Sequence, residues 1–339
     1  MVKTLHPGYL AMVMATGIIS TAFLMLNQML LSGALLGVAG LAYVVLVVLY
    51  AWRILRYPDE VSADVHEPQR AFGFFTFVAA SNVLAIRVAL SGNLRLSEFL
   101  WLLGSLGWLV LTYVIPSVLI MQPEKKPIGE ALNGSWLIWV VGTQSVAAAA
   151  ATLAFYHAGR TEALATVAVF MWSVGVVLYL ALIGMIMMRL FFHKLEPVYL
   201  SPPYWINMGA CAITVIAGAR ILVLPPELAA IQVVRPVVEG LSFMLWAWGT
   251  WWIPSLVIMG VWRHGYQHHP LSYEPTLWSM VFPLGMYAAS STAFGRAVKL
   301  PLLVGIAHWE VWVALVAWVL VLAGLVSTWL RPRRQTGAP

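Results

Sequence analysis

The sequence contains very little charge. Only 9% of its 339 residues are Asp, Glu, Lys or Arg, against roughly 25% in a typical soluble domain. Hydrophobic residues make up 61% of the chain, and the mean hydropathy is +0.86. So few charges cannot cover a surface that faces water on all sides. The composition therefore indicates an integral membrane protein with little mass outside the bilayer.

Residue types that carry metal or cofactor chemistry are also scarce. Cys211 is the only cysteine, which excludes an intrachain disulfide and a cysteine metal cage. His264, His268 and His269 lie in one short hydrophilic loop, but no carboxylate or cysteine spacing completes a metal site there. Neither a Walker A sequence nor a dinucleotide-binding glycine motif occurs. We therefore predict no metal, no cofactor and no enzymatic activity.

Long apolar stretches fill almost the whole chain. A membrane-spanning helix needs roughly 20 apolar residues, and ten stretches meet that length: Gly8–Leu31, Gly33–Trp52, Ala71–Leu90, Phe99–Gln122, Ala131–Tyr156, Ala163–Met188, Pro203–Leu224, Val237–Trp262, Pro275–Gly295 and Val311–Leu330. Short turns join them in pairs. The sequence predicts an all-α integral membrane protein in which residues 1–339 form one transmembrane domain of ten helices, arranged as five helical hairpins around a central pore.

The basic residues predict the orientation of the chain in a cell membrane. Cytoplasmic loops of membrane proteins are enriched in Lys and Arg. One side of the predicted bundle collects most of these residues: Lys3, Arg53, Arg56, Arg70, Lys125, Lys126, Arg189, Lys194, Arg263, Arg331, Arg333 and Arg334. Both termini are therefore expected in the cytoplasm, and the acidic segment Tyr57–Gln69 is expected to be the longest inner loop. The net charge of +6 is scattered over such loops, so we expect no nucleic-acid partner.

Three of the odd-numbered apolar stretches resemble one another. They read FFTFVAASNVLAIR to Arg87, NMGACAITVIAGAR to Arg220 and PLGMYAASSTAFGR to Arg296. Small residues allow helices to approach closely in lipid, so packing alone explains their composition. A repeated hairpin around an axis explains more, because it also places the three arginines on one outer rim. The even-numbered stretches are richer in Val and Leu, as expected of helices that face lipid.

Ionisable residues inside membrane helices often mark function, and this chain has few. Arg87 and Arg220 are expected near the outer boundary, where each serves either as a functional charge or as a side chain that reaches the interface. Glu239 and Glu310 are expected near the outer ends of their helices. They either pair with those arginines or take up protons during transport.

A proline interrupts the ninth apolar stretch at Phe282-Pro283-Leu284-Gly285. Proline in a helix interior leaves a carbonyl without its donor and bends the helix. Phe282 precedes that bend, and Gly285 follows it at the point where a large side chain would otherwise crowd the ring. Phe282 is either an ordinary packing residue or a gate that faces the central axis.

Several segments resemble a known family along the whole chain. HPGYLAMVMATGIIS from His6, NGSWLIWVVGTQSVA from Asn133, PPYWINMGA from Pro202 and WSMVFPLGMY from Trp278 are similar to the tellurite-resistance/dicarboxylate transporter family. That family includes the guard-cell slow anion channel, a bacterial tellurite-resistance homologue, and yeast malate and sulfite transporters. The resemblance implies five hairpins with the odd helices around a pore, a homotrimer with one pore per subunit, and a pore-occluding phenylalanine that matches Phe282.

The residues and the resemblance together predict a membrane transporter of small inorganic or organic anions. Arg87, Arg220 and Arg296 would form its outer basic rim, and Phe282, Pro283 and Gly285 its gate. The alternative is a proton-coupled carrier of C4-dicarboxylates such as malate, or of sulfite, with Glu239 or Glu310 taking up the proton. Besides these anions, membrane lipids are the expected partners.

Overall fold

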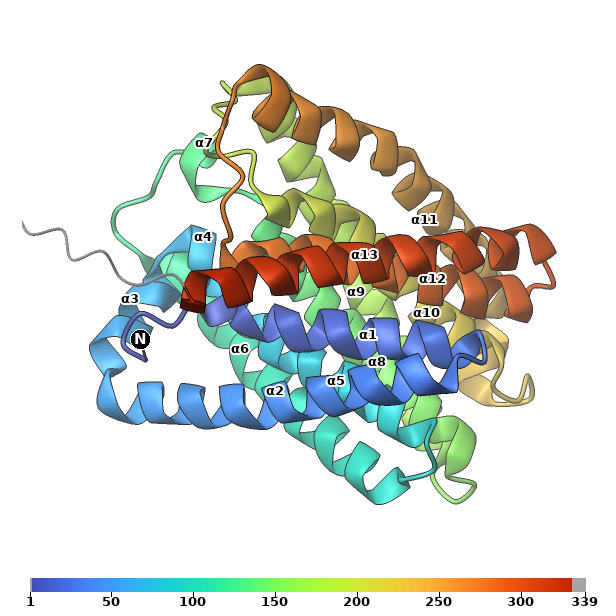
Figure 1. The fold of residues 1–339 in the computed structure, drawn as a ribbon. Coiled ribbons are helices and arrows are strands. Elements are labelled where there is room, and N and C mark those ends of the chain that lie inside the picture. The colour runs from blue at the N-terminus through green and yellow to red at the C-terminus, as the bar shows by residue number, and fades with distance from the viewer. Residues whose placement is uncertain (1, 331–339) are drawn as a thin grey trace, which may run out of the picture.

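The computed structural model describes residues 2–330, and within them all regular structure is helical. Among the described residues, nine helical segments are long and apolar enough to cross a membrane. Together with α12 (Trp278–Ala297) they form five hairpins (Figure 1). The hairpins pair α1 with α2, α5 with α6, α8 with α9, α10 with α11 and α12 with α13. The bounds of the other nine helices are Ala11–Met25 (α1), Met29–Arg56 (α2), Phe75–Ala89 (α5), Leu94–Met121 (α6), Ile138–Tyr156 (α8), Thr161–Phe192 (α9), Ile206–Leu222 (α10), Ala229–Val261 (α11) and Pro301–Leu330 (α13).

The first helix of every hairpin is buried and the second is exposed. Between 78% and 94% of the apolar window is buried in the spans that contain α1, α5, α8 and α10, against 17% to 44% in those of α2, α6, α9, α11 and α13. Nearly every residue of α12 is buried as well. This confirms the predicted division into inner and outer helices. Its physical cause is composition, because the Ala, Gly, Ser and Thr of the inner helices permit close helix contacts.

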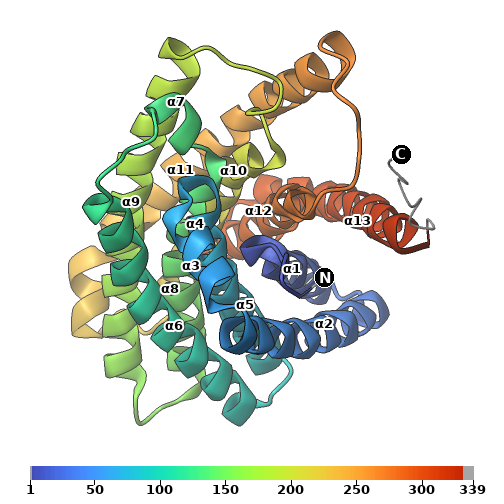
Figure 2. The ribbon, with the colours of Figure 1, turned by 90° about the vertical axis from the view of Figure 1, so that its left-hand side faces the viewer.

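The five inner helices form a closed ring. α1 packs against α5, α5 against α8, α8 against α10, α10 against α12, and α12 against α1. Figure 2 views this ring from one end, with the outer helices around it. Because each hairpin returns through its outer helix, the five inner helices run in the same direction. Their carboxyl ends therefore lie together, and so do their amino ends.

Each outer helix is joined to the inner helix of a neighbouring hairpin by a hydrogen bond that involves an aromatic side chain of the outer helix. Trp108 Nε1 of α6 donates to Thr143 Oγ1 of α8 (2.8 Å), and Trp172 Nε1 of α9 donates to the Thr214 carbonyl of α10 (3.1 Å). The same relation recurs for Trp246 of α11 with Ser291 of α12 (2.8 Å), Trp318 of α13 with Thr16 of α1 (2.8 Å), and Tyr43 of α2 with Ser81 of α5 (2.7 Å). These five bonds, the aromatic latches, join the hairpins in sequence around the ring.

Every inner helix begins with a short 3₁₀ segment at the same end of the ring. These segments are Pro7–Leu10, Phe72–Phe74, Gly134–Leu137, Pro202–Trp205 and Pro275–Leu277, and consecutive segments contact one another around the ring. Proline at three of the starts suits the first turn of a helix, which needs no N–H there. Glycine permits the close approach, because a Cβ at Gly73 would lie 3.0 Å from the backbone nitrogen of Gly8.

Two sequence expectations differ from the structure, and a third concerns residues that the structure does not describe. Outer helices begin earlier than predicted, at Ala229 rather than Val237 and at Pro301 rather than Val311. The apolar runs there are interrupted by Arg235 and Pro236 in α11 and by His308 and Glu310 in α13, although the helices continue through these residues. Segment Tyr57–Gln69 is not a loop. It contains α3 (Pro58–His66) and the start of α4 (Pro68–Ala71). The basic tail Arg331, Arg333 and Arg334 lies outside the described residues.

Candidate functional site

A polar cavity of about 220 Å³ lies where the amino ends of the five inner helices meet. We call it the vestibule. Every inner helix contributes to its wall at or just before its 3₁₀ start, and the outer helix α9 contributes Arg189; the lining residues used below are His6, Gln69, Arg70, Asn133, Ser135, Arg189, Ser201 and Glu274. It is the end that the basic residues predict to face the cytoplasm. The structure thus brings together residues that lie far apart in the sequence.

Arg189 is a buried cation in the vestibule wall. Its side chain is only 1% exposed. Nε and Nη2 donate to the carbonyl of Gly129 (3.1 and 2.7 Å), and Nη1 donates to the hydroxyl of Tyr204 (2.5 Å). Among the described residues no carboxylate lies within ion-pair distance of it. A buried charge bound only to neutral oxygens leaves its field uncompensated, and that field favours an anion nearby.

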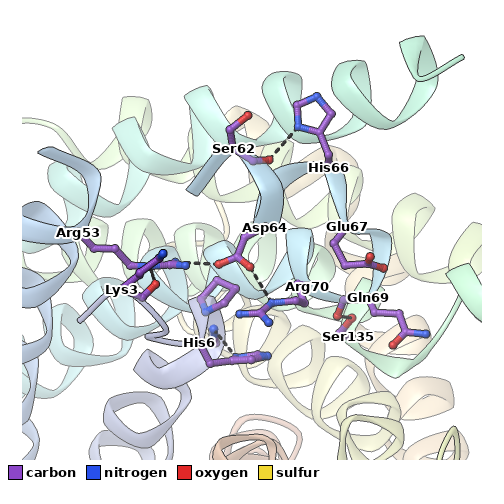
Figure 3. A network of polar contacts seen from close by, with 12 residues as sticks. Lys3, His6, Arg53, Ser62, Asp64, His66, Glu67, Gln69, Arg70 and Ser135 are labelled. Atoms are coloured by element: carbon purple, nitrogen blue, oxygen red, sulfur yellow. Dashed lines mark hydrogen bonds and ion pairs between the residues drawn. The ribbon is translucent and has the colours of Figure 1, made fainter. Parts of the chain in front are cut away.

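Arg70 enters the vestibule from the other side, and Asp64 positions it. Asp64 on α3 is buried and forms two ion pairs, from Oδ1 to Arg70 Nε and from Oδ2 to Arg53 Nη1, both at 2.7 Å (Figure 3). Arg53 is 2% exposed, whereas the Arg70 side chain is 38% exposed. One carboxylate therefore holds two guanidinium groups. The cluster retains a net positive charge, and Arg70 lines the cavity.

His6 is the N-cap residue of the first inner helix, and its side chain is neutral. Its Nδ1 accepts from the backbone N–H of Gly8 at 3.0 Å. Burial and, after it, the nearby charges of Arg70 and Arg53 together lower the pKa of His6 to about 4. The imidazole is therefore uncharged at neutral pH.

The three arginines at the carboxyl end of the ring occupy different environments. Each lies in the last turn of its inner helix. Arg296 is exposed and donates to the carbonyl of Met25 (2.7 Å), and Arg220 is partly buried. Arg87 is 4% exposed and donates to the hydroxyls of Ser20, Ser32 and Ser91 (2.9, 2.8 and 2.5 Å).

Arg87 therefore connects three helices rather than reaching the interface. Its serine partners belong to α1, α2 and the end of α5. Of the two alternatives for Glu239 and Glu310, the described residues show no ion pair with Arg87 or Arg220, and proton uptake stays a prediction. Three serine hydroxyls accept hydrogen bonds from the N–H groups of Arg87, so its hydrogen-bonding capacity is used without a carboxylate.

Glu239 and Glu310 lie farther along their helices than predicted. α11 begins at Ala229 and α13 at Pro301, so each carboxylate is about three turns inside its helix rather than near the outer end. Glu239 is exposed and Glu310 is partly buried. Both belong to outer helices.

The direction of Phe282 follows from the contacts of its helix. Gly209 of α10 packs against Pro283, and the closest neighbours of Gly285 and Gly295 are side chains of α1 and α13. Successive residues of an α-helix are rotated by about 100° around its axis, so each contact can be given an angle around α12 with Pro283 at zero. On this scale the α13 contact at Gly295 lies at about 120° and the α1 contact at Gly285 at about 200°. Phe282 lies at about 260°. Phe282 thus points into the sector between α1 and α10, which is the ring interior, and its side chain is 1% exposed.

Gly285 has a more specific place than the sequence suggests. A Cβ there would lie 2.7 Å from the side chain of Ile19. The glycine permits α1 and α12 to pack closely, so the space it leaves is occupied by α1 and not by the Phe282 ring.

Comparison with known proteins assigns the family. The model of the SLAC1 family, described as voltage-dependent anion channels, matches residues 4–326. The chain therefore belongs to this family, as its motifs indicated under the tellurite-resistance/dicarboxylate transporter name. It is a multi-pass membrane protein, and its class of function is membrane anion transport.

Relatives extend over most of the chain. An uncharacterized transporter of Methanocaldococcus jannaschii is 24% identical over 333 residues, which cover 96% of this chain and 95% of that protein. A sulfite efflux pump of Arthroderma benhamiae is 23% identical over 349 residues, covering 95% and 90%. An uncharacterized membrane protein of Mycobacterium tuberculosis is 44% identical over 149 residues, covering 44% of this chain and 75% of the other. The matched family is described as anion channels, and the first two of these relatives are named a transporter and an efflux pump.

Sequence reasoning missed the vestibule. Arg70 and Arg189 entered it only as charges that set the orientation, and Asp64 only as part of an acidic loop. The available signal was the Pro or Gly at each inner-helix start, as in Pro7-Gly8 and Pro202-Pro203. That signal marks helix starts, but it does not show that they converge.

Proposed function

We propose that anions cross the membrane along the axis of the inner ring, and that Phe282 closes this path. Residues 1–339 act as one transport domain. The observation that supports the path most directly is the direction of Phe282, which faces the interior of a closed ring of five parallel helices. A hydrophobic constriction blocks ions by dewetting. Pro283 packs against α10 and Gly285 packs against α1, and these two contacts fix the position of α12.

The two ends of the path differ in their proposed roles. At the carboxyl ends of the inner helices, Arg296 and the partly buried Arg220 supply an outer basic rim that raises the local anion concentration. Arg87 supports this rim from behind by holding α1, α2 and α5 together. At the amino ends, the vestibule receives or releases the anion on the side predicted to be cytoplasmic.

Replacing Phe282 tests the gate. Phe282→Ala is expected to raise anion current severalfold in planar bilayers, because the apolar plug is removed from the axis. Phe294→Ala is the matched control. Phe294 is equally buried in the same helix, but it lies at about 20° from Pro283 and faces α10. Each substitution deletes a buried ring and typically costs about 3–5 kcal/mol of stability, so both proteins are compared at equal folded amounts. A current in Phe282→Ala no larger than in Phe294→Ala would end the gate assignment.

A proton-coupled carrier is the second candidate, because relatives of the chain are named sulfite efflux pumps. Glu310 is the better placed carboxylate, since it is partly buried and Glu239 is exposed. In liposomes, flux that requires a pH gradient and is lost in Glu310→Gln would favour the carrier of sulfite or C4-dicarboxylates such as malate. Flux that follows the anion gradient alone favours the channel. The homotrimer remains a proposal, which cross-linking in the membrane would test.

A further inference from the structure

We propose that the vestibule is a binding site selective for oxyanions, in which Arg70 is the direct ligand and Asp64 positions it. This rests on the proposed function, in which the vestibule is one mouth of the transport path. The ligand class is a small anion with two oxygens on one centre, such as sulfite, sulfate or a carboxylate.

The free edge of Arg70 determines this class. Its Nε is engaged by Asp64 Oδ1 at 2.7 Å, and among the described residues no protein acceptor engages Nη1 or Nη2. Two parallel N–H donors in one plane match two oxygens of one anion and give bidentate binding. A halide offers a single centre and gains no such geometry.

The other charged residues of the vestibule wall add to the positive charge of Arg70 more than they neutralise it. Arg189 lies in the same cavity wall with only neutral partners. Glu274 is the acidic residue in the wall; it lies 3.9 Å from Arg263 and its side chain is 40% exposed. The cavity therefore contains more positive than negative charge, in a setting partly shielded from water where electrostatic attraction is stronger.

Helix ends reinforce that charge. The amino end of a helix carries partial positive charge, and here five of them meet. None of the five 3₁₀ starts has an acidic residue in its first turn. The side chains that cap two of the starts are the imidazole of His6 and the amide oxygen of Asn133, which are neutral at pH 7. Glu274 immediately precedes the fifth start. The partial charges of the other four helix ends thus remain available to a bound anion.

Direct binding to the purified full-length protein tests the site. Sodium sulfate is titrated against sodium chloride at equal ionic strength, and thermal stabilisation and calorimetry report binding. We expect sulfate to bind at least about tenfold more tightly than chloride, and Arg70→Gln to abolish that preference. Arg56→Gln is the matched control, since Arg56 is an exposed arginine at the same end of the bundle and outside the vestibule.

Arg70→Lys separates shape from charge and retains an ion pair with Asp64 if the Gln variant fails to fold. Loss of the sulfate preference in Arg70→Lys with chloride binding unchanged supports bidentate recognition. Wild-type sulfate binding in either Arg70 variant, or equal binding of both anions by wild type, overturns the proposal. Flux in liposomes is measured separately. Anion flux without Arg70-dependent sulfate binding would contradict the proposed binding site but not the transport path. Arg70-dependent sulfate binding without flux would contradict the transport path but not the binding site.

Discussion

At the scale of single residues, the chain satisfies buried charge in two ways. Arg53 and Arg70 share one carboxylate at Asp64, whereas Arg87 and Arg189 bind only hydroxyl and carbonyl oxygens. Oxygens without charge stabilise a guanidinium less than a carboxylate does. The second arrangement therefore suits positions where a surplus of positive charge is useful to an anion transporter.

His6 predicts how stability depends on pH. Its pKa is about 4 in the folded protein and 6.5 in the unfolded chain, so protons bind more tightly after unfolding. The stabilisation is complete above pH 6.5 and is lost as pH falls from 6.5 toward 4. The free energy of unfolding should be about 2 kcal/mol lower at pH 5 than at pH 7.5 through this group. His6→Asn keeps a capping acceptor but does not titrate. Thermal unfolding in detergent at both pH values should show a smaller drop in the variant, and equal drops would contradict the assignment.

At the scale of helices, the aromatic latches explain why hairpins of similar composition assemble in one order. Each latch joins an outer helix to an inner helix of the adjacent hairpin, so a hairpin in the wrong place would leave a buried N–H or hydroxyl without a partner. Within a membrane few other groups can satisfy it. The abundant tryptophans, which the sequence alone assigns to interfacial belts, therefore include four that fix the neighbours of the inner ring.

Trp318 provides the test of a latch. Trp318→Phe removes the donor to Thr16 Oγ1 (2.8 Å) and keeps an aromatic ring at a position only 9% exposed. A double-mutant cycle with Thr16→Val should give a coupling of about 0.6 kcal/mol, typical of hydrogen bonds between membrane helices. Trp309→Phe is the control, because Trp309 lies on the same helix but is 80% exposed. Coupling of Thr16 to Trp309 as large as to Trp318 would show that the latch contributes nothing specific.

At the scale of the whole molecule, the parallel inner helices give the transporter two different ends. Carboxyl ends with Arg296 and Arg220 lie on one side, and the vestibule lies on the other. The basic residues predict that the vestibule end is cytoplasmic. Single cysteines at Asn27 and Gly159 should therefore react with an impermeant thiol reagent in intact cells, and those at Ser62 and Gln267 only after lysis. All four positions are exposed and the native Cys211 is buried, so the background is low. The reverse pattern of labelling would invert the orientation.

Much of this architecture is encoded locally. Apolar length determined the number of helices, and the small residues before Arg87, Arg220 and Arg296 identified the inner helices, because both depend only on residues adjacent in sequence. The Phe282-Pro283 pair was recognisable for the same reason. Apolarity marked the helix starts less well, as Glu239 and Glu310 illustrate, because polar residues in the second and third turns interrupt the apolar run and hide the turn before them.

Only the tertiary structure decided which distant residues meet. Asp64, Arg70 and Arg189 belong to three separate segments, and no periodicity relates them. They converge because five hairpins close into a ring, and closure depends on contacts such as Gly73 with Gly8 and Gly209 with Pro283, which join helices far apart in the chain. For Arg87, the sequence left open whether it is a functional charge or a side chain that reaches the interface. The structure shows it buried, because α1 and α2 supply serine partners for it. The sequence by itself thus determined the elements and their class, and packing around the ring decided which charges face an anion.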